Sequence, residues 1–236
     1  MDIQLSKRLQ LIATLLRQGS YFLDIGSDHA YLPCYVCIQD PEARAIAGEV
    51  VTGPFERAKQ TVRNYQLQDR IDVRLGSGFE VLKDDSIDEV VIAGMGGSLI
   101  SSILKDGKAY LPKVERLILQ PNNHEERVRR TLRELNFVLT EEYIIEEKDI
   151  FYEVLVAERE ALKNSPSPYD DDKLEKQLFF GPYLLEEGSA IFRKKWAEEK
   201  EKLEKTLEQM KHSQSDIGEK IASFEKRLRW IEEVLS

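Results

Sequence analysis

Between residues 20 and 160, short apolar runs alternate with segments of helical periodicity. A helix between two strands returns the chain to the starting edge of a sheet, so this alternation predicts parallel strands with helices packed on both faces. We therefore expect an α/β domain. Its first five strands are predicted at residues 21–26, 43–50, 71–78, 88–97 and 116–122.

Two further apolar stretches, 137–147 and 151–159, have no helical pattern between them. We expect them to pair as a hairpin that closes the sheet. Seven strands that end in a hairpin are typical of a Rossmann-like methyltransferase sheet rather than of a dinucleotide dehydrogenase sheet. Between the strands, Pro54 suits the first turn of a helix, and Asn123 with Glu126 has the spacing of a capping box.

The pattern changes after residue 160. Residues 161–173 contain two prolines, serines and an acidic run, a composition typical of a linker. Two apolar stripes at helical spacing follow, separated by KHSQSD, and Asp216 with Glu219 can cap the second helix. So short a turn makes the two helices antiparallel. We predict a sheet domain over 1–160, and a linker with a helical hairpin over 161–236 that holds RNA, packs against another surface or dimerises.

The charge of the whole chain is a weak guide to its partners. The formal net charge is −9, but phosphate binding needs only a local basic face. The chain has no run near the ~18 apolar residues that cross a bilayer. Its N-terminal segment has the spacing of an amphipathic helix and lacks a small-residue cleavage site. We expect a cytoplasmic protein that is not bound to a membrane.

The two cysteines, Cys34 and Cys37, form a single C-x-x-C. A structural zinc site requires four ligands, and the three histidines are scattered at 29, 124 and 212. A spacing of three places both thiols on one apolar helical face. We expect small buried side chains and no metal, with a redox or metal role as the alternative.

Polar residues and glycines follow the predicted strands, where ligands bind in parallel sheets. An NAD fingerprint would read G-x-G-x-x-G from Gly26, but Asp28 and Tyr31 occupy its second and third glycine positions. A diphosphate would meet a carboxylate on this loop, so a cationic ligand is favoured. S-adenosylmethionine carries an ammonium and a sulfonium group. We expect it to be bound here by Asp24, Gly26, Ser27 and His29.

The second and third strands end in Gly48-Glu49 and in Gly76-Ser77-Gly78. An acidic side chain at the first position can accept hydrogen bonds from both ribose hydroxyls of an adenosine ligand; a surface glutamate is the alternative. Ser77 can accept a weak hydrogen bond from the adenine amino group, or the segment is an ordinary glycine turn. We assign Glu49, Gly76, Ser77 and Gly78 to cofactor binding.

The fourth strand ends in three glycines within four positions, beginning at Gly94. This density indicates close approach of a ligand or of another backbone, and we assign Gly94 to the cofactor. Met95 can press against a flat base or fill a gap. The amides of Gln120 and Asn122, and residues 152–153, can contact the edge of a base or be structural.

Several of these segments occur together in one order. They read DIGSDHAYLP at 24–33, AGE with GPF at 47–55, IAGMGG at 92–97, LILQPN at 117–122 and YEVLVAE at 152–158. Together they resemble the bacterial tRNA (adenine-22-N1)-methyltransferase family. The resemblance runs from SKRL at residue 6 to the end of the chain and includes the Gly-Pro at 181–182.

The resemblance implies a Rossmann-like methyltransferase domain that binds S-adenosylmethionine over 1–160, a C-terminal coiled coil, and methylation of N1 of one adenine in tRNA. Family patterns often read G-D-G at the third-strand turn, where this chain has Ser77. The target base must leave its stack, which costs a few kcal/mol. No general base is expected, because adenine N1 is largely unprotonated at neutral pH.

Methylation leaves the base cationic, so a nearby carboxylate would stabilise the transition state more than the ground state. Asp28 is the candidate catalytic carboxylate; alternatively, it holds its loop by hydrogen bonds to backbone amides. Tyr31 and Asn122 are assigned to the substrate base together with Met95. Tyr31 and His29 can stack on the base or line the cofactor.

Basic residues near the N-terminus, Lys7 and Arg8, can contact tRNA phosphates. Further basic residues on two predicted helices can do the same or simply face solvent: Arg57, Lys59, Arg63, Arg127, Arg129, Arg130 and Arg133. We expect a monomer, with a dimer as the alternative. Two other functions remain open: methylation of another RNA, a small molecule or a protein, and RNA binding without catalysis.

Overall fold

The computed structural model describes residues 3–83, 85–159, 167–211 and 218–236. The chain forms two compact units, Met1–Pro168 and Tyr169–Ser236. Among the residues described, no helix is both long and apolar enough to span a membrane.

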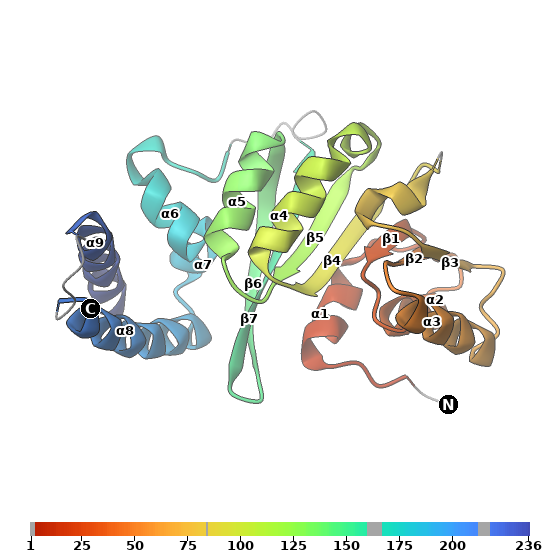
Figure 1. Ribbon diagram of the computed structural model, residues 1–236, viewed down its shortest axis with the longest axis horizontal. Coiled ribbons are helices and arrows are strands. Elements are labelled where there is room, and N and C mark those ends of the chain that lie inside the picture. Colours follow the sequence, from red (N-terminus) through yellow and green to blue (C-terminus); the bar gives the residue numbers. More distant parts are fainter. Residues whose placement is uncertain (1–2, 84, 160–166, 212–217) are drawn as a thin grey trace. The chain divides into compact units, whose positions relative to one another are not determined.

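The first unit contains a seven-stranded sheet in the order β3-β2-β1-β4-β5-β7-β6 (Figure 1). Its strands are β1 Tyr21–Ile25, β2 Arg44–Glu49, β3 Ile71–Leu75, β4 Glu89–Met95, β5 Arg116–Pro121, β6 Phe137–Glu147 and β7 Ile150–Arg159. The first five are parallel, and β7 runs antiparallel to both β5 and β6. The predicted seven strands and closing hairpin are confirmed. The strand order reverses between β1 and β4, which is where such sheets bind ligands.

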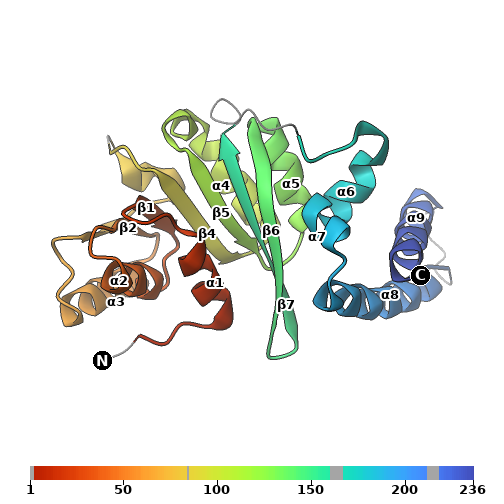
Figure 2. The ribbon, with the colours of Figure 1, turned by 180° about the vertical axis from the view of Figure 1, so that it is seen from behind.

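Helices cover both faces of this sheet. They are α1 Lys7–Leu15, α2 Tyr31–Gln39, α3 Thr52–Asn64, α4 Gly97–Asp106 and α5 Glu125–Glu134, with short 3-10 helices η1 Gly78–Leu82, η2 Gly107–Ala109 and η3 Leu111–Lys113. The first three share a core with one face, and α4 and α5 cover the other (Figures 1 and 2). Burial on both faces explains why strands such as Val90–Ile92 are apolar without alternation.

The hairpin of β6 and β7 is longer than the strand beside it. β7 pairs with β5 only over residues 155–158, but with β6 over its whole length. The free part of the hairpin continues past the carboxyl end of β5, as Figure 2 shows. It therefore reaches the edge of the sheet at which ligands are expected.

The capping box predicted at Asn123 and Glu126 is wrong. Helix α5 begins at Glu125, and its N-cap is His124, which has a φ of +56° and makes no side-chain capping bond. The carbonyl of Asn123 instead accepts the N–H of Gly97 at 2.9 Å. The chain turns sharply at His124 because this backbone bond holds the loop against the start of α4.

The cysteine pair lies in α2, and both side chains are buried and free. Burial raises the pKa of Cys34 to about 12 and that of Cys37 to about 11. Both are therefore thiols at neutral pH, as expected for side chains that fill space. Within the described ranges, no group of three or more His, Cys, Asp or Glu side chains is arranged to hold a metal ion.

The second unit is helical: η5 Asp171–Lys173, α6 Leu174–Phe180, α7 Pro182–Glu187, α8 Ala190–Lys211 and α9 Gly218–Leu235. Arg193, early in α8, donates to the carbonyl of Val234, late in α9, at 3.2 Å. The antiparallel hairpin is thus confirmed. The predicted cap Asp216 lies outside the described residues, as do residues 161–166 of the predicted linker, whereas its last three residues form η5.

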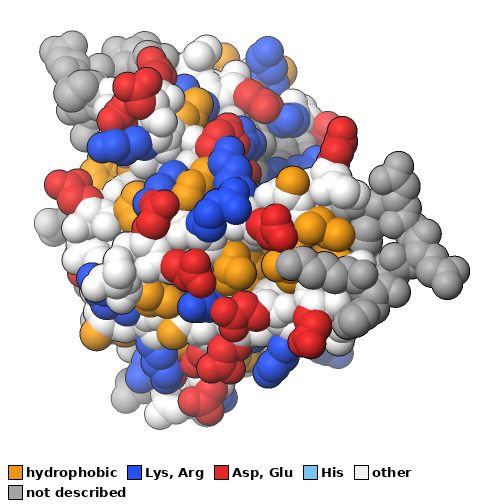
Figure 3. Space-filling view, turned by 90° about the vertical axis from the view of Figure 1, so that its left-hand side faces the viewer, with side chains coloured by type: hydrophobic (Ala, Val, Ile, Leu, Met, Phe, Trp, Pro, Cys, Tyr) orange, Lys and Arg blue, Asp and Glu red, His pale blue; other side chains and the backbone are white. Residues whose placement is uncertain are grey.

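Two short helices of this unit, α6 and α7, are not predicted from the sequence. Gly181 at φ +89° separates them, and Pro182 begins the second. Two side chains of α6 form an aromatic cluster with both long helices: Phe179, Phe180, Phe192, Trp196 and Trp230. On the face seen in Figure 3, acidic and basic side chains are interspersed.

Candidate active site

The loop after β1 has a strained conformation. Gly26, at φ +71°, and Ser27 both donate backbone hydrogen bonds to the carbonyl of Gly48, at 2.9 and 3.2 Å. Three residues without glycine's freedom then adopt positive φ in succession: Asp28, His29 and Ala30. Such conformations are costly and are concentrated at functional sites. The strain lies in the loop expected to meet the cofactor.

Beneath this loop, Asp24 and Ser27 are both buried. The Ser27 hydroxyl donates to Asp24 Oδ2 at 2.6 Å. Burial, together with the nearby carboxylates of Glu49 and Asp28, raises the pKa of Asp24 to about 7, and the Ser27 hydrogen bond partly opposes that shift. A positive charge on a ligand at this loop would favour the ionised form of Asp24.

Glu49, at the end of β2, is buried, yet its Oε1 has no hydrogen-bond partner among the described residues. Burial raises the pKa of this carboxyl, while the backbone N–H groups of His29 and Asp28 partly offset the shift. A buried carboxylate oxygen without a donor is costly. A ligand hydroxyl would satisfy it, so the residues present fit the ribose of an adenosine ligand.

Asp28 projects to the rim of the site, where its side chain is 88% exposed. Its Oδ1 lies 3.3 Å from His29 Nε2, and the His29 ring meets Tyr31 edge-on, with ring centroids 5.7 Å apart. Tyr31 is itself exposed. The structure thus brings the predicted carboxylate and both predicted rings together at one open position.

The turn after β3 is shaped by packing. A Cβ on Gly76 would lie 2.9 Å from Val81 Cγ1, and Gly78 has a φ of +53°. The N–H of Gly76 also donates to the carbonyl of Glu49 at 2.8 Å. Both glycines are therefore required by the turn itself, which favours the structural alternative for them. Ser77 precedes η1 at the same edge of the sheet.

The glycines after β4 meet other parts of the protein. A Cβ on Gly97 would lie 2.5 Å from the carbonyl oxygen of His124, so close approach of another backbone accounts for this glycine. A Cβ on Gly26 would collide with Met95 Cε. The Met95 methyl group therefore packs over Gly26, which favours the gap-filling alternative for Met95.

A network of amides joins the ends of β4 and β5. Gly94, at φ +76°, donates its N–H to Gln120 Oε1 at 3.0 Å. Gln120 Nε2 donates to Asn122 Oδ1 at 3.1 Å, and Asn122 Nδ2 donates to the carbonyl of Gly94 at 2.8 Å. Gln120 is fully buried, whereas Asn122 is exposed. Gln120 is therefore structural, and Asn122 faces the open side of the site.

The sequence assigns Arg8 to contacts with tRNA phosphates, but the structure places its side chain in this network. Its Nη1 donates to Gln120 Oε1, and its guanidinium lies over the Tyr152 ring, 5.3 Å from the centroid. The sequence does contain one indication of this network: Gln120 is a polar residue within a buried apolar strand, so its amide requires hydrogen-bond partners. Lys7 remains exposed.

One residue of the predicted basic clusters is misassigned. Arg129 is fully buried, with its guanidinium 2.7 Å from Glu142 and 2.5 Å from Glu153. It pairs with carboxylates of β6 and β7 and is unable to reach tRNA. Arg130 forms an ion pair of 2.8 Å with Glu126, whereas Arg127 is exposed.

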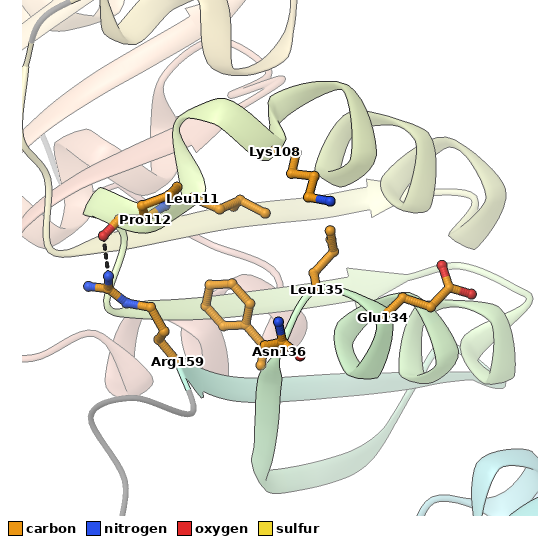
Figure 4. Close-up of a pocket in the computed structure, with 8 residues that line it drawn as sticks. Lys108, Leu111, Pro112, Glu134, Leu135, Asn136 and Arg159 are labelled. Atoms are coloured by element: carbon orange, nitrogen blue, oxygen red, sulfur yellow. Dashed lines mark hydrogen bonds between the residues drawn. The ribbon is translucent and has the colours of Figure 1, made fainter.

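A hollow of about 640 Å³ lies at the opposite edge of the sheet (Figure 4). Arg159 crosses its rim and donates to the carbonyl of Pro112. Its wall combines the end of α5 with the segment before β5: Lys108, Leu111, Pro112, Glu134, Leu135, Asn136, Phe137 and Arg159. None of these residues belongs to the predicted site.

Comparison with known proteins accords with this geometry. The family model described as tRNA (adenine(22)-N(1))-methyltransferase matches residues 22–233. The protein of that name from Bacillus subtilis (strain 168) is 41% identical over 236 residues, which cover 99% of this chain and 98% of the relative.

Two solved structures support the same family assignment. The crystal structure of the B. subtilis m1A22 tRNA methyltransferase is 39% identical and superposes with a TM-score of 0.89 over 100% of both chains. The M. capricolum protein TrmK, in complex with the natural cofactor product S-adenosyl-homocysteine, is 26% identical, with a TM-score of 0.81 over 98% of this chain and 97% of that one. The chain therefore belongs to the tRNA (adenine(22)-N(1))-methyltransferase family.

Proposed function

We propose that this protein transfers a methyl group from S-adenosylmethionine to N1 of adenine 22 in tRNA. The observation that carries the proposal is the buried, unpartnered Oε1 of Glu49, within the described residues, beside the strained loop after β1. This arrangement, at the carboxyl edge of the sheet, fits an adenosine ligand that carries positive charge. Family membership supports tRNA as the substrate.

The cofactor is assigned to one set of side chains and backbone groups. Glu49 would accept hydrogen bonds from the ribose hydroxyls, and Asp24 would supply negative charge beneath the loop. The remaining contacts are assigned to Gly26, Ser27, His29, Ser77 and Gly94, whereas Gly76 and Gly78 shape the turn that carries Ser77. When bound, S-adenosylmethionine supplies an activated methyl group, so the protein mainly has to position the base.

The substrate base is assigned to the open rim. Tyr31 and Asn122 orient it, and Asp28 offsets the positive charge that develops on the ring. Met95 instead fills the space over Gly26. The Asp28 carboxylate is largely exposed and lies beside the His29 ring. This position favours the catalytic role over the loop-holding alternative, because an exposed carboxylate is accessible to a base that enters from solvent.

We assign residues 1–160 to cofactor binding and the hairpin within 161–236 to holding tRNA, with Lys7 as a further phosphate contact. The assigned site residues all come from the first unit of one chain, so a monomer is sufficient. The methyl donor is already activated, so the reaction as proposed uses no metal ion.

The test is transfer from labelled S-adenosylmethionine to unmodified tRNA transcripts, with identification of the modified nucleoside. Wild type is compared with Asp28→Ala and Asp28→Asn, and the tRNA with a transcript in which adenine 22 is replaced by another base. We expect N1-methyladenosine from wild type alone, and none from the altered transcript. Cofactor binding without transfer to any tRNA would overturn the tRNA assignment; no cofactor binding would overturn catalysis altogether.

A further inference from the structure

Every hydrogen-bonding position of the buried Gln120 amide is used. Oε1 accepts from the Gly94 N–H at 3.0 Å and from Arg8 Nη1. Nε2 donates to the carbonyl of Pro121 at 2.9 Å and to Asn122 Oδ1 at 3.1 Å. A primary amide has two donors and two acceptor sites, so this side chain has one satisfied orientation.

Arg8 reaches this amide from α1, 112 residues earlier in the chain. Its guanidinium packs over the Tyr152 ring, and a Cβ on Gly94 would lie 2.9 Å from its Nη1. The N–H of Lys7 donates to Glu147 Oε1 at 3.0 Å, which ties the start of α1 to the β6–β7 hairpin. The N-terminal helix is therefore a wall of the site.

We infer that Arg8 is a positioning residue, which orients Asn122 and the Gly94 carbonyl through Gln120. The inference rests on the proposed function. A guanidinium has only donors, so Gln120 must turn its oxygen towards Arg8 and its nitrogen towards Asn122. Asn122 must then turn its own nitrogen towards the carbonyl of Gly94, where they lie 2.8 Å apart.

As a consequence, the Asn122 amide at the open side of the site has a fixed orientation towards the substrate. With one N–H of Asn122 committed to Gly94, its second N–H is the donor that an exposed Asn122 presents to a base. If Arg8 is absent, Oε1 of Gln120 loses one of its two donors. The Gly94 N–H still favours the same orientation, but the amide is held by one bond fewer, and the Asn122 side chain that it positions can shift. Misplacement of about 1 Å at a reacting centre lowers rates by roughly 10²-fold.

The alternative for Arg8, a tRNA phosphate contact, makes a different prediction. Removal of a phosphate contact weakens tRNA binding and lowers the dependence of affinity on salt concentration by about one ion. Removal of a positioning residue lowers kcat and leaves both tRNA affinity and its salt dependence unchanged. The two roles therefore separate in one set of measurements.

The experiment compares wild type with Arg8→Met, which keeps an unbranched stem, and with Arg8→Lys, which keeps a donor and a charge. Arg44→Met is the matched control, because Arg44 also lies over a tyrosine ring, Tyr21 at 5.4 Å, but at the opposite edge of the sheet. We measure kcat, KM for tRNA, the dissociation constant of S-adenosylmethionine, and tRNA affinity at several salt concentrations.

We expect Arg8→Met to lower kcat by about 10- to 100-fold, with cofactor affinity and salt dependence unchanged. Arg8→Lys should recover part of the activity, and Arg44→Met should match wild type. Unchanged kcat in Arg8→Met, with or without a weaker salt dependence, would overturn the inference. An inactive wild type would instead count against the proposed function.

A second variant keeps the inference testable if Arg8→Met unfolds at a lower temperature. Gln120→Glu retains an acceptor for the Gly94 N–H and gains an ion pair with Arg8, but it is unable to donate to Asn122 or to the carbonyl of Pro121. We expect it to lower kcat as Arg8→Met does, and the fold-decrease of the double variant to be smaller than the product of the two single decreases. Multiplicative decreases would show that Arg8 does not act through Gln120.

Discussion

The Ser27 hydroxyl donates a 2.6 Å hydrogen bond to Asp24 Oδ2 within a buried pair. Burial raises the pKa of Asp24 to about 7, from an ordinary value of 3.8. Between these two values, the folded protein binds a proton on Asp24 that the unfolded chain has released. The stability contributed by this group therefore falls as pH rises from about 4 to 7 and is constant above that range.

Asp24→Asn should remove this decline. Because the amide does not ionise, we expect the variant to exceed wild type in free energy of unfolding by a few kcal/mol at pH 8 and to lose that advantage towards pH 4. Urea denaturation without cofactor, from pH 4 to 8, measures both curves. If the free energies of unfolding of wild type and variant changed with pH in parallel, Asp24 would be ionised over the whole range from pH 4 to 8. Ser27→Ala is the companion variant. Loss of the hydroxyl should raise the pKa of Asp24 further, because the hydroxyl lowers that pKa, and the decline should therefore extend to higher pH.

Glu49→Ala should weaken S-adenosylmethionine binding. Hydrogen bonds to charged groups contribute about 1.5–3 kcal/mol, which corresponds to roughly 10- to 100-fold in the dissociation constant. Isothermal titration measures the effect. Glu56→Ala, an exposed glutamate of α3, is the control and should bind as wild type does. Equal affinities for the two variants would remove Glu49 from the ribose site.

Arg129→Met should destabilise the protein without altering a surface charge. It leaves two buried carboxylates, Glu142 and Glu153, without the cation that lies 2.7 and 2.5 Å away. Breaking a buried pair costs about 3–5 kcal/mol. The control is Arg127→Met on the exposed side of the same helix, with an expected change within about 0.5 kcal/mol. Denaturant titration gives both values, and similar values would contradict the buried role.

Gly97→Ala should be destabilising by about 1–3 kcal/mol, because the new methyl group meets backbone that is unable to move aside. Its Cβ would lie 2.5 Å from the carbonyl oxygen of His124 and 2.6 Å from that of Asn123. Gly53→Ala is the matched helical control, with nothing within 4 Å of its Cβ among the described residues. It should be neutral or stabilising by up to about 1 kcal/mol. Thermal melting of both variants distinguishes the two outcomes.

Charge reversal on the hairpin tests its assignment to tRNA. Lys205→Glu and Lys220→Glu, on exposed positions of α8 and α9, should weaken tRNA binding and reduce its salt dependence by about one ion for each phosphate that is no longer neutralised. Cofactor affinity should not change. The opposite reversal, Glu208→Lys, should strengthen binding if the hairpin faces RNA. No response to any of the three would assign the hairpin to another role.

Local features of the sequence were enough to predict most of the fold. The apolar runs of β1, β2, β4 and β5 are continuous because both faces of a parallel sheet are buried, and periodicity alone predicts α8 and α9. Gly26 also predicts its turn locally, because the conformation of that turn depends on the backbone of this residue alone. The short helices α6 and α7 have too few turns to show a periodic pattern.

Local patterning was thus sufficient for the order and type of the main elements, the edge of the sheet that binds ligands, and the family. Which polar residues face solvent depends instead on contacts between distant parts of the chain. Arg129 meets carboxylates 13 and 24 residues later, and Arg8 meets Gln120 112 residues later. A charged residue on a helix has the same local pattern whether it is solvated or paired. Only folding brings its distant partner within hydrogen-bonding distance, and that contact determines what the residue does.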